Sequence, residues 1–173
     1  LSDFLTHEIL SGLPGEMKNL LFSTALLGSF CFDLIKSCYI KSENNTLNEA
    51  NFDELFDQLI KSDLFLISLD DNWKWFRYHH LFQQNLISHL SDRFDSTEKT
   101  SIYLAAANWY EKEGMIDQAL ENLLKANESE KAGALVSRHA HAEFIKGVGK
   151  VESWLNKLPP ELREINPSLV MLK

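Results

Sequence analysis

The sequence predicts a mainly α-helical protein, with one β-hairpin packed among helices in the first half and an array of helices in the second half. Apolar residues recur at helical spacing along most of the 173 residues. Only residues 64–78 are instead rich in β-branched and aromatic residues, around a polar turn. Beyond residue 95, helical segments with alanines alternate with short breaks. Hydrophobic residues make up 45% of the chain, which is enough for a packed core.

Three helices are expected before residue 41. Residues 1–10 place apolar side chains at helical spacing, and the Gly-Leu-Pro-Gly sequence at 12–15 ends this first helix. A second helix is expected at 16–27 and a third at 30–39, because both segments repeat the apolar spacing. The polar residues 41–50 then predict a surface loop.

A fourth helix and the hairpin come next. Asn51 can cap the helix, with Glu54 three residues further on as the partner in a variant of the capping box. The strands are expected at 64–69 and 73–78, and the Asp-Asp-Asn sequence at 70–72 supplies the turn. The sequence indicates no other clear β-structure. Because two strands alone are marginal in water, they must pack against the neighbouring helices.

The order of the elements favours a winged helix followed by a second helical domain. A helix at 80–93 follows the hairpin, and helices, a hairpin and a further helix are the order found in a winged helix. We place this first domain at residues 1–94. Asp95 and Glu98 then form another capping box, which opens the second domain at 95–173.

The second domain is expected to be an array of helical hairpins. A helix that begins near residue 102 breaks at Gly114, and its antiparallel partner follows at 116–124. A third helix at 129–146 and a fourth at 151–158 repeat the arrangement. Alanines at facing positions let such helices approach closely.

Charge and composition limit the classes of function. The 17 basic and 25 acidic residues give a net charge of −8, which disfavours direct contact with nucleic acid phosphates. No apolar run reaches the roughly 18 residues of a membrane-spanning helix, so we expect no membrane contact. Cys31 and Cys38 are expected to be reduced, buried thiols in a cytoplasmic protein. The chain lacks an initiator Met and stops within a new apolar stretch, so we expect it to be part of a longer polypeptide.

Residues 108–126 resemble the turn and second helix of a tetratricopeptide repeat. The matching signature residues are Tyr110, Gly114, Ile116, Ala119 and Ala126. The following pair of helices lacks this signature, so the array is expected to be tetratricopeptide-like rather than regular.

The first half resembles the large ATP-binding transcription regulators of the LuxR family. The resemblance lies in Leu13 and Pro14 before an apolar helix, in residues 64–66, and in the sequence WFRYHHLF at 75–82. These regulators belong to the STAND class of signal-transduction ATPases. The resemblance implies that this chain is a winged helix and helical arm between an upstream nucleotide-binding domain and a downstream repeat-built sensor, with a C-terminal helix-turn-helix beyond it. It also implies ATP or ADP as the cofactor of the full-length protein, and self-association on activation.

The resemblance implies a role for one residue. In related STAND proteins, a Met-His-Asp triplet at the start of the last winged-helix helix presents its His to the β-phosphate of ADP. The matching triplet is Tyr78, His79 and His80, and only His79 is carried over as the ADP sensor. A His suits this role because it can donate a ring N–H while neutral and gains charge beside a phosphate. The alternative is that both histidines cap the hairpin-to-helix junction and that one ring packs against Trp75.

Other patterns do not predict catalysis or metal binding. Gly147 to Lys150 reads Gly-Val-Gly-Lys, but it lacks the first glycine and the Ser or Thr of a Walker A motif, so a flexible turn between helices is expected. His139 and His141 lie two residues apart, on different faces of a helix, and nothing completes a metal set. Aromatic strand residues such as Trp73 and Phe76 are expected in the core rather than on a docking surface.

We therefore expect a regulatory segment that is not an enzyme by itself. It would couple the ADP or ATP state of an upstream nucleotide-binding domain to downstream sensor and DNA-binding domains. The alternative is a stand-alone tetratricopeptide-like adaptor that binds a peptide in the groove of its hairpins. A small hydrolase has no residue pattern in its favour.

Overall fold

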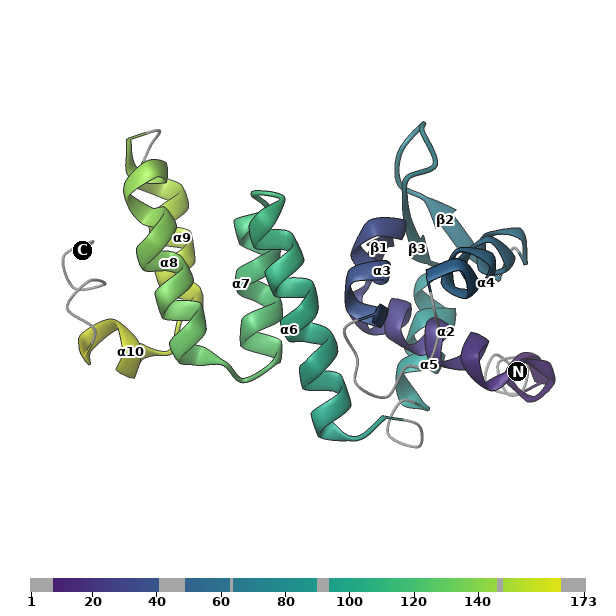
Figure 1. Cartoon of the computed structure of the whole chain (residues 1–173). Helices are drawn as coiled ribbons and strands as arrows, with labels where there is room; N and C mark the ends of the chain where they lie inside the picture. The colour runs from purple at the N-terminus through teal and green to yellow at the C-terminus, as the bar shows by residue number, and fades with distance from the viewer. Residues whose placement is uncertain (1–7, 41–48, 63, 90–93, 146–147, 166–173) are drawn as a thin grey trace. The chain divides into compact units, whose positions relative to one another are not determined.

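The structure, a computed structural model, describes residues 8–40, 49–62, 64–89, 94–145 and 148–165 (Figure 1). The chain folds into two compact units, unit 1 at residues 1–102 and unit 2 at 103–173. Their boundary lies inside helix α6 (Ser96–Lys112), whereas the boundary expected from the sequence lies just before that helix. None of the described helices is long and apolar enough to cross a membrane.

Unit 1 consists of helices around a small antiparallel sheet. A short helical segment at 8–12 leads into the other elements. These are α2 (Gly15–Leu27), β1 (Ser29–Cys31), α3 (Phe32–Ile40), α4 (Glu49–Lys61), β2 (Leu66–Ser68), β3 (Trp75–Tyr78) and α5 (His80–Ser88). The mainly helical prediction and the hairpin formed by β2 and β3 are confirmed.

The sheet has three strands in the order β1-β3-β2, one strand more than the sequence indicated. The additional strand β1 covers Ser29–Cys31, where a helix at 30–39 was expected to begin. Gly28 accounts for the difference: its φ of +85° ends α2 in a left-handed conformation that suits glycine, so the chain changes direction. Phe30 then pairs with Phe76 of β3. A strand of three residues is too short to show a period of two, which is why the sequence pattern missed it.

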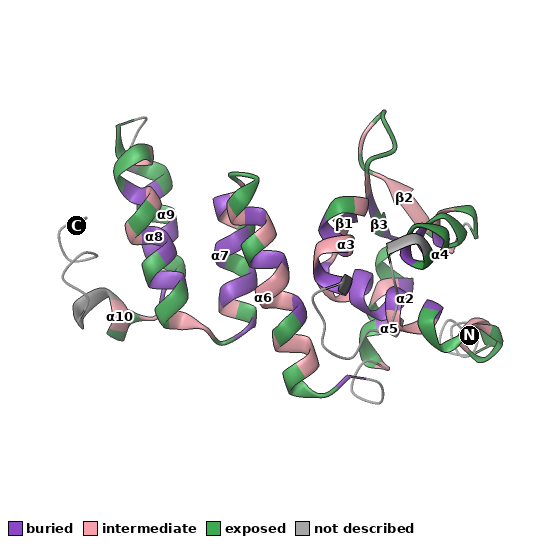
Figure 2. Ribbon diagram, in the orientation of Figure 1, coloured by how far each residue is buried: buried purple, intermediate pink, exposed green. Residues whose placement is uncertain are grey.

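An aromatic cluster attaches the sheet to the helices. The fully buried Phe30 has its ring centroid 6.0 Å from that of Phe76 and 5.5 Å from that of Tyr78. The ring of Phe56 on α4 lies 6.4 Å from that of Phe30 between centroids, in an edge-to-face arrangement. Burying such a ring contributes about 1.5–3 kcal/mol, so the cluster is a major part of the core, which appears purple in Figure 2.

Two helices of unit 1 begin or end where the sequence did not predict. α4 starts at Glu49, so Asn51 lies within its first turn and is not the N-cap. α5 ends at Ser88, whereas the sequence pattern extended to residue 93. Residues 90–93, and most of the expected loop at 41–50, lie outside the described residues.

Unit 2 is an array of helices joined by short turns (Figure 1). The rest of α6 is followed by α7 (Ile116–Lys125), α8 (Ser129–Phe144), α9 (Val148–Lys157) and α10 (Pro160–Ile165). Gly114, with a φ of +73°, makes the predicted break after α6. The predicted capping box at the start of α6 is confirmed, because the Asp95 N–H donates to Glu98 at 3.0 Å and the Glu98 N–H donates to Asp95 at 2.7 Å.

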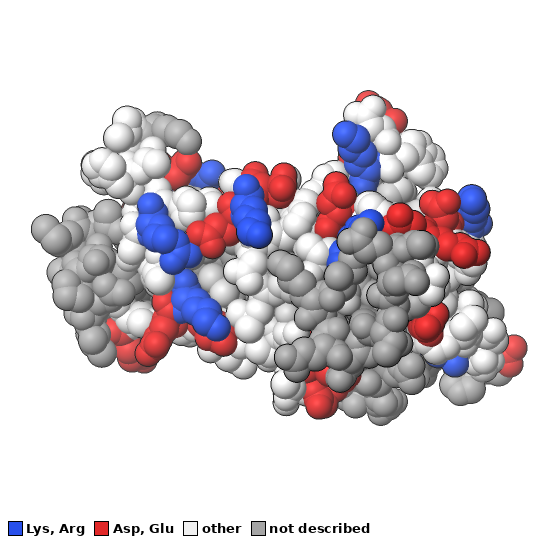
Figure 3. Space-filling view, viewed as in Figure 1, with Lys and Arg blue, Asp and Glu red and all other residues white. Residues whose placement is uncertain are grey.

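Aliphatic side chains, alanines and one tryptophan fill the interior of unit 2. Ala119 of α7 and Ala132 of α8 are fully buried, which allows close packing of the helices. Trp154 of α9 is also fully buried, and its indole N–H donates to an oxygen of Asp117 at 2.7 Å. Outside this interior, basic and acidic side chains are interspersed along the helices (Figure 3).

The expected flexible turn at residues 147–150 is partly wrong. Val148, Gly149 and Lys150 form the first turn of α9. Lys150 lies in ion pairs with Asp117 at 3.5 Å and Glu143 at 3.8 Å, which fix it on the helix surface. Only residues 146–147 between α8 and α9 lie outside the described residues.

Candidate functional site

His79 lies at the junction between strand β3 and helix α5, and its side chain is exposed. Its backbone is fixed on both sides of the junction. The His79 N–H donates to the carbonyl oxygen of Phe65 at 2.8 Å, and the His79 carbonyl accepts the N–H of Gln83 at 3.0 Å. The junction therefore has a defined backbone conformation while the imidazole faces solvent.

The residue before it, Tyr78, is completely buried and attaches the junction to helix α2. Its hydroxyl lies 2.7 Å from Oγ1 of Thr24. The Thr24 hydroxyl has one hydrogen, and it donates this to the helix carbonyls of Leu20 and Leu21 at 2.8 and 2.9 Å. The Tyr78 O–H must therefore be the donor to Thr24. Burial, only partly offset by this hydrogen bond, raises the pKa of Tyr78 far above its ordinary value, so the phenol stays neutral.

Residues in the first turns of α5 also hold the β3–α5 junction in place. The Gln83 side-chain amide donates to the carbonyl of Ala25 on α2 at 2.9 Å. The ring of Phe82 lies with its centroid 5.6 Å from that of Tyr78 and 5.1 Å from that of Phe65. The junction is thus held against α2 by buried contacts before and after His79.

His79 and His80 are the exposed histidines at this junction. The rings of His79 and His80 lie 4.8 Å apart between centroids, and both side chains are exposed. His79 occupies the N-cap position of α5 but makes no side-chain cap hydrogen bond, so the capping role considered above is not observed. The N-terminus of a helix carries a partial positive charge, and imidazole N–H groups are good donors to phosphate oxygens. Chemically, these groups could donate hydrogen bonds to a phosphate.

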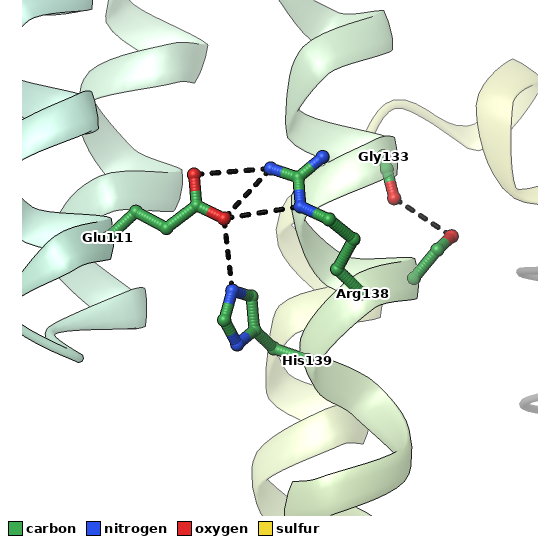
Figure 4. A network of polar contacts seen from close by, with 5 residues as sticks. Glu111, Gly133, Arg138 and His139 are labelled. Atoms are coloured by element: carbon green, nitrogen blue, oxygen red, sulfur yellow. Dashed lines mark hydrogen bonds and ion pairs between the residues drawn. The ribbon is translucent and has the colours of Figure 1, made fainter.

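His139, one of the two histidines at positions 139 and 141, has a structural role in unit 2. Ring nitrogen Nε2 of His139 lies 3.0 Å from Oε1 of Glu111, and the guanidinium of Arg138 donates to both oxygens of the same carboxylate (Figure 4). These contacts join α6 to α8, and we call them the Glu111 cluster. Among the described residues, no group of three or more His, Cys, Asp or Glu side chains could hold a metal ion.

The structure also exposes apolar side chains around the junction that sequence reasoning missed. Phe65 is 50% exposed and Leu81 is 49% exposed. Trp73, which was expected in the core, is 69% exposed at the tip of the hairpin, whereas Phe76 is buried as expected. Alternation along the strand could have placed Phe76 inside, but Trp73 lies in the turn, where alternation gives no information.

The comparisons with known proteins agree with this fold. The sequence matches the family described as the MalT winged helix domain over residues 6–99, more than half of the chain. It is 29% identical over 174 residues to the HTH-type transcriptional regulator MalT of Cronobacter sakazakii (strain ATCC BAA-894). It is 28% identical to the proteins of that name from Klebsiella pneumoniae strain 342 and Klebsiella pneumoniae subsp. pneumoniae strain ATCC 700721 / MGH 78578. Each alignment covers 100% of this chain but 18% of the relative, so the chain spans only a small part of these curated proteins.

Proposed function

This chain belongs to the MalT winged helix domain family, and we propose that it is the regulatory segment of a larger ATP-dependent transcriptional regulator. In that protein a nucleotide-binding domain precedes the segment, and a repeat-built sensor and a DNA-binding domain follow it. The segment couples the ADP or ATP state of the first domain to the others. We propose no catalytic role for the segment itself, and ATP or ADP is the cofactor of the full-length STAND ATPase.

One observation supports the proposal: the imidazole of His79 is exposed, while residues on either side of it are attached to helix α2. Tyr78 and Gln83 attach the junction to α2, so the position of His79 is tied to that of unit 1 as a whole. A phosphate held by a neighbouring domain could accept a ring N–H from His79. A ligand bound there by His79 would therefore hold unit 1 in one position.

The proposed switch needs two states of similar free energy. With ADP bound, the His79 contact holds unit 1 against the nucleotide-binding domain in the resting state. Inducer binding to the sensor favours ATP, releases unit 1 and permits self-association of the full-length protein. A bias of a few kcal/mol is enough to exchange the populations of two such states.

Nucleotide exchange by the intact protein tests the role of His79. A hydrogen bond to a charged group contributes about 1.5–3 kcal/mol, so we expect His79→Ala to speed the release of a fluorescent ADP analogue by roughly 10- to 150-fold. The release rate is measured by stopped-flow fluorescence after adding excess unlabelled ADP.

His141→Ala is the matched control, because His141 is an exposed histidine on α8 in unit 2. It should leave ADP release unchanged. If His79→Ala releases ADP at the rate of the control, His79 does not sense the nucleotide.

The helical array of unit 2 favours one second candidate, a stand-alone adaptor that binds a peptide between its hairpins. This function needs neither His79 nor a nucleotide. It predicts that the 173-residue chain retains a partner peptide by itself in a pull-down. The regulatory proposal predicts that retention requires the neighbouring domains.

A further inference from the structure

Gln83, in the first turn of α5, forms hydrogen bonds with both His79 and helix α2. Its backbone N–H donates to the carbonyl oxygen of His79 at 3.0 Å. Its side-chain nitrogen Nε2 donates to the carbonyl oxygen of Ala25 on α2 at 2.9 Å. A single residue therefore connects the backbone of His79 with α2 through two hydrogen bonds.

The carbonyl group of Ala25 needs a donor from outside its own helix. α2 ends at Leu27, so Ala25 is among its last four residues, and the carbonyl groups of these residues have no N–H partner within a regular helix. Ala25 is also fully buried, and a buried carbonyl group without a donor is unfavourable. The Gln83 amide supplies the donor, and both helices depend on this hydrogen bond.

The Gln83 amide also lies over the turn that ends α2. A Cβ atom built on Gly28 would lie 3.6 Å from Nε2 of Gln83. Gly28 leads directly into strand β1, where Ser29 pairs with Arg77 of β3, two residues before His79. The side chain of Gln83 thus joins α5 to the point at which the chain enters the sheet that ends at the β3–α5 junction.

The donor is specific to this position on α5. α5 packs against α2 (Figure 1), and Gln83 is half-buried, whereas the neighbouring Gln84 is exposed. A methionine at position 83 could occupy a similar volume, but it could not donate a hydrogen bond. The packing and the hydrogen bond of Gln83 can therefore be separated by substitution.

We propose that Gln83 is a positioning residue for His79. Its amide fixes the first turn of α5 on the end of α2 and thereby sets the direction in which the backbone presents the imidazole. The inference rests on the proposed function, because it takes His79 to contact the nucleotide. It adds a residue one helical turn away that does not touch the phosphate. Without the amide, the first turn of α5 can shift and the imidazole loses part of its alignment.

ADP release by the intact protein, measured by stopped-flow fluorescence, tests the inference. Gln83→Met removes the donor and keeps the length of the side chain. We expect it to speed ADP release by about 2- to 10-fold, less than His79→Ala, because a hydrogen bond between neutral groups is weaker than one to a charged phosphate. Gln84→Met is the matched control and should release ADP at the original rate. Equal rates for the two methionine variants would overturn the inference.

A double variant shows whether Gln83 acts through His79. Once His79→Ala has removed the imidazole, Gln83→Met should speed ADP release no further. An equal acceleration by Gln83→Met with and without His79 would overturn the positioning role and leave the role of His79 intact. An effect of His79→Ala without one of Gln83→Met contradicts this inference alone, whereas the absence of any effect of His79→Ala contradicts the proposed function itself.

The pH dependence of Gln83→Glu separates the hydrogen bond from packing. An ionised carboxylate cannot donate to the Ala25 carbonyl, but a protonated carboxyl group can. We expect this variant to release ADP faster than the original protein at about pH 8, and the ratio of the two rates to fall as the pH is lowered to about 5. Because the two proteins are compared at each pH, the protonation of His79 affects both. A ratio that stays constant with pH would show that the donor at position 83 does not position His79.

Discussion

The buried hydroxyl groups of Tyr78 and Thr24 form a contact that attaches the β3–α5 junction, and with it His79, to helix α2. Tyr78→Phe removes a buried donor and leaves an oxygen of Thr24 without this partner. We expect the free energy of unfolding to fall by about 1–2 kcal/mol, because an unsatisfied buried polar group costs about that much. Urea denaturation of the 173-residue chain, followed by tryptophan fluorescence, measures the change.

A double-mutant cycle shows whether the pair is responsible. Thr24→Val removes the other hydroxyl, and the double variant removes both with little change of shape. The double variant should lose less stability than the sum of the two single variants, since no polar atom of the pair is left unsatisfied. Additive losses would mean that the two hydroxyls act independently.

Single residues differ in how well the sequence predicts them. The sensor role of His79 was predicted from its resemblance to a family motif and stays a prediction, while the structure shows that its side chain is exposed. Trp73 was expected in the core. Its exposure depends on the turn geometry set by Asp70, and a carboxylate that accepts two backbone N–H groups gives no periodic signal.

At the level of elements, the Glu111 cluster couples α6 to α8 and should make unit 2 sensitive to acid. Burial raises the pKa of Glu111, but hydrogen bonds from His139 and Arg138 outweigh it and hold the pKa below its ordinary value of 4.5. A depressed folded-state pKa contributes stability above pH 4.5, and this contribution is lost as the pH falls through the folded value.

Glu111→Gln tests this linkage. The substitution should lower the free energy of unfolding by about 0.5–1 kcal/mol at pH 7, because the pairs are partly exposed and screened by solvent. Near pH 3 the difference between the variant and the original chain should shrink, since Glu111 is then increasingly protonated in the original chain. Urea midpoints at the two pH values measure it, and an equal difference at both would contradict the pKa shift.

Two strong local signals were predicted correctly, whereas a strand that depends on long-range pairing was missed. The capping box of Asp95 and Glu98 and the break at Gly114 are local chemistry and lie where expected. Strand β1 exists because Ser29–Cys31 pairs with β3, more than forty residues away in the sequence. Its three residues carry no pattern of their own, and a helical signal from the following α3 extended over them.

At the scale of the whole molecule, the net charge of −8 argues against nucleic acid binding by this winged helix. Many winged helices and helix-turn-helix domains read DNA with the helix that precedes the hairpin. Here that helix is α4, and its exposed side chains include Asp53, Glu54 and Asp57. Three carboxylates on that surface would meet the phosphate backbone with like charge.

We therefore expect this chain not to bind a random DNA duplex at physiological salt, as measured by fluorescence anisotropy. Replacing Asp53, Glu54 and Asp57 by lysine should create measurable, salt-sensitive binding, because affinity for a duplex rises with the number of phosphates that basic residues neutralise. Such binding by the variant would show that the shape of the fold permits contact with DNA and that the negative charge of α4 prevents this contact in the original chain. Binding by the original chain with a steep salt dependence would contradict the assignment of DNA contact to another domain of the proposed regulator.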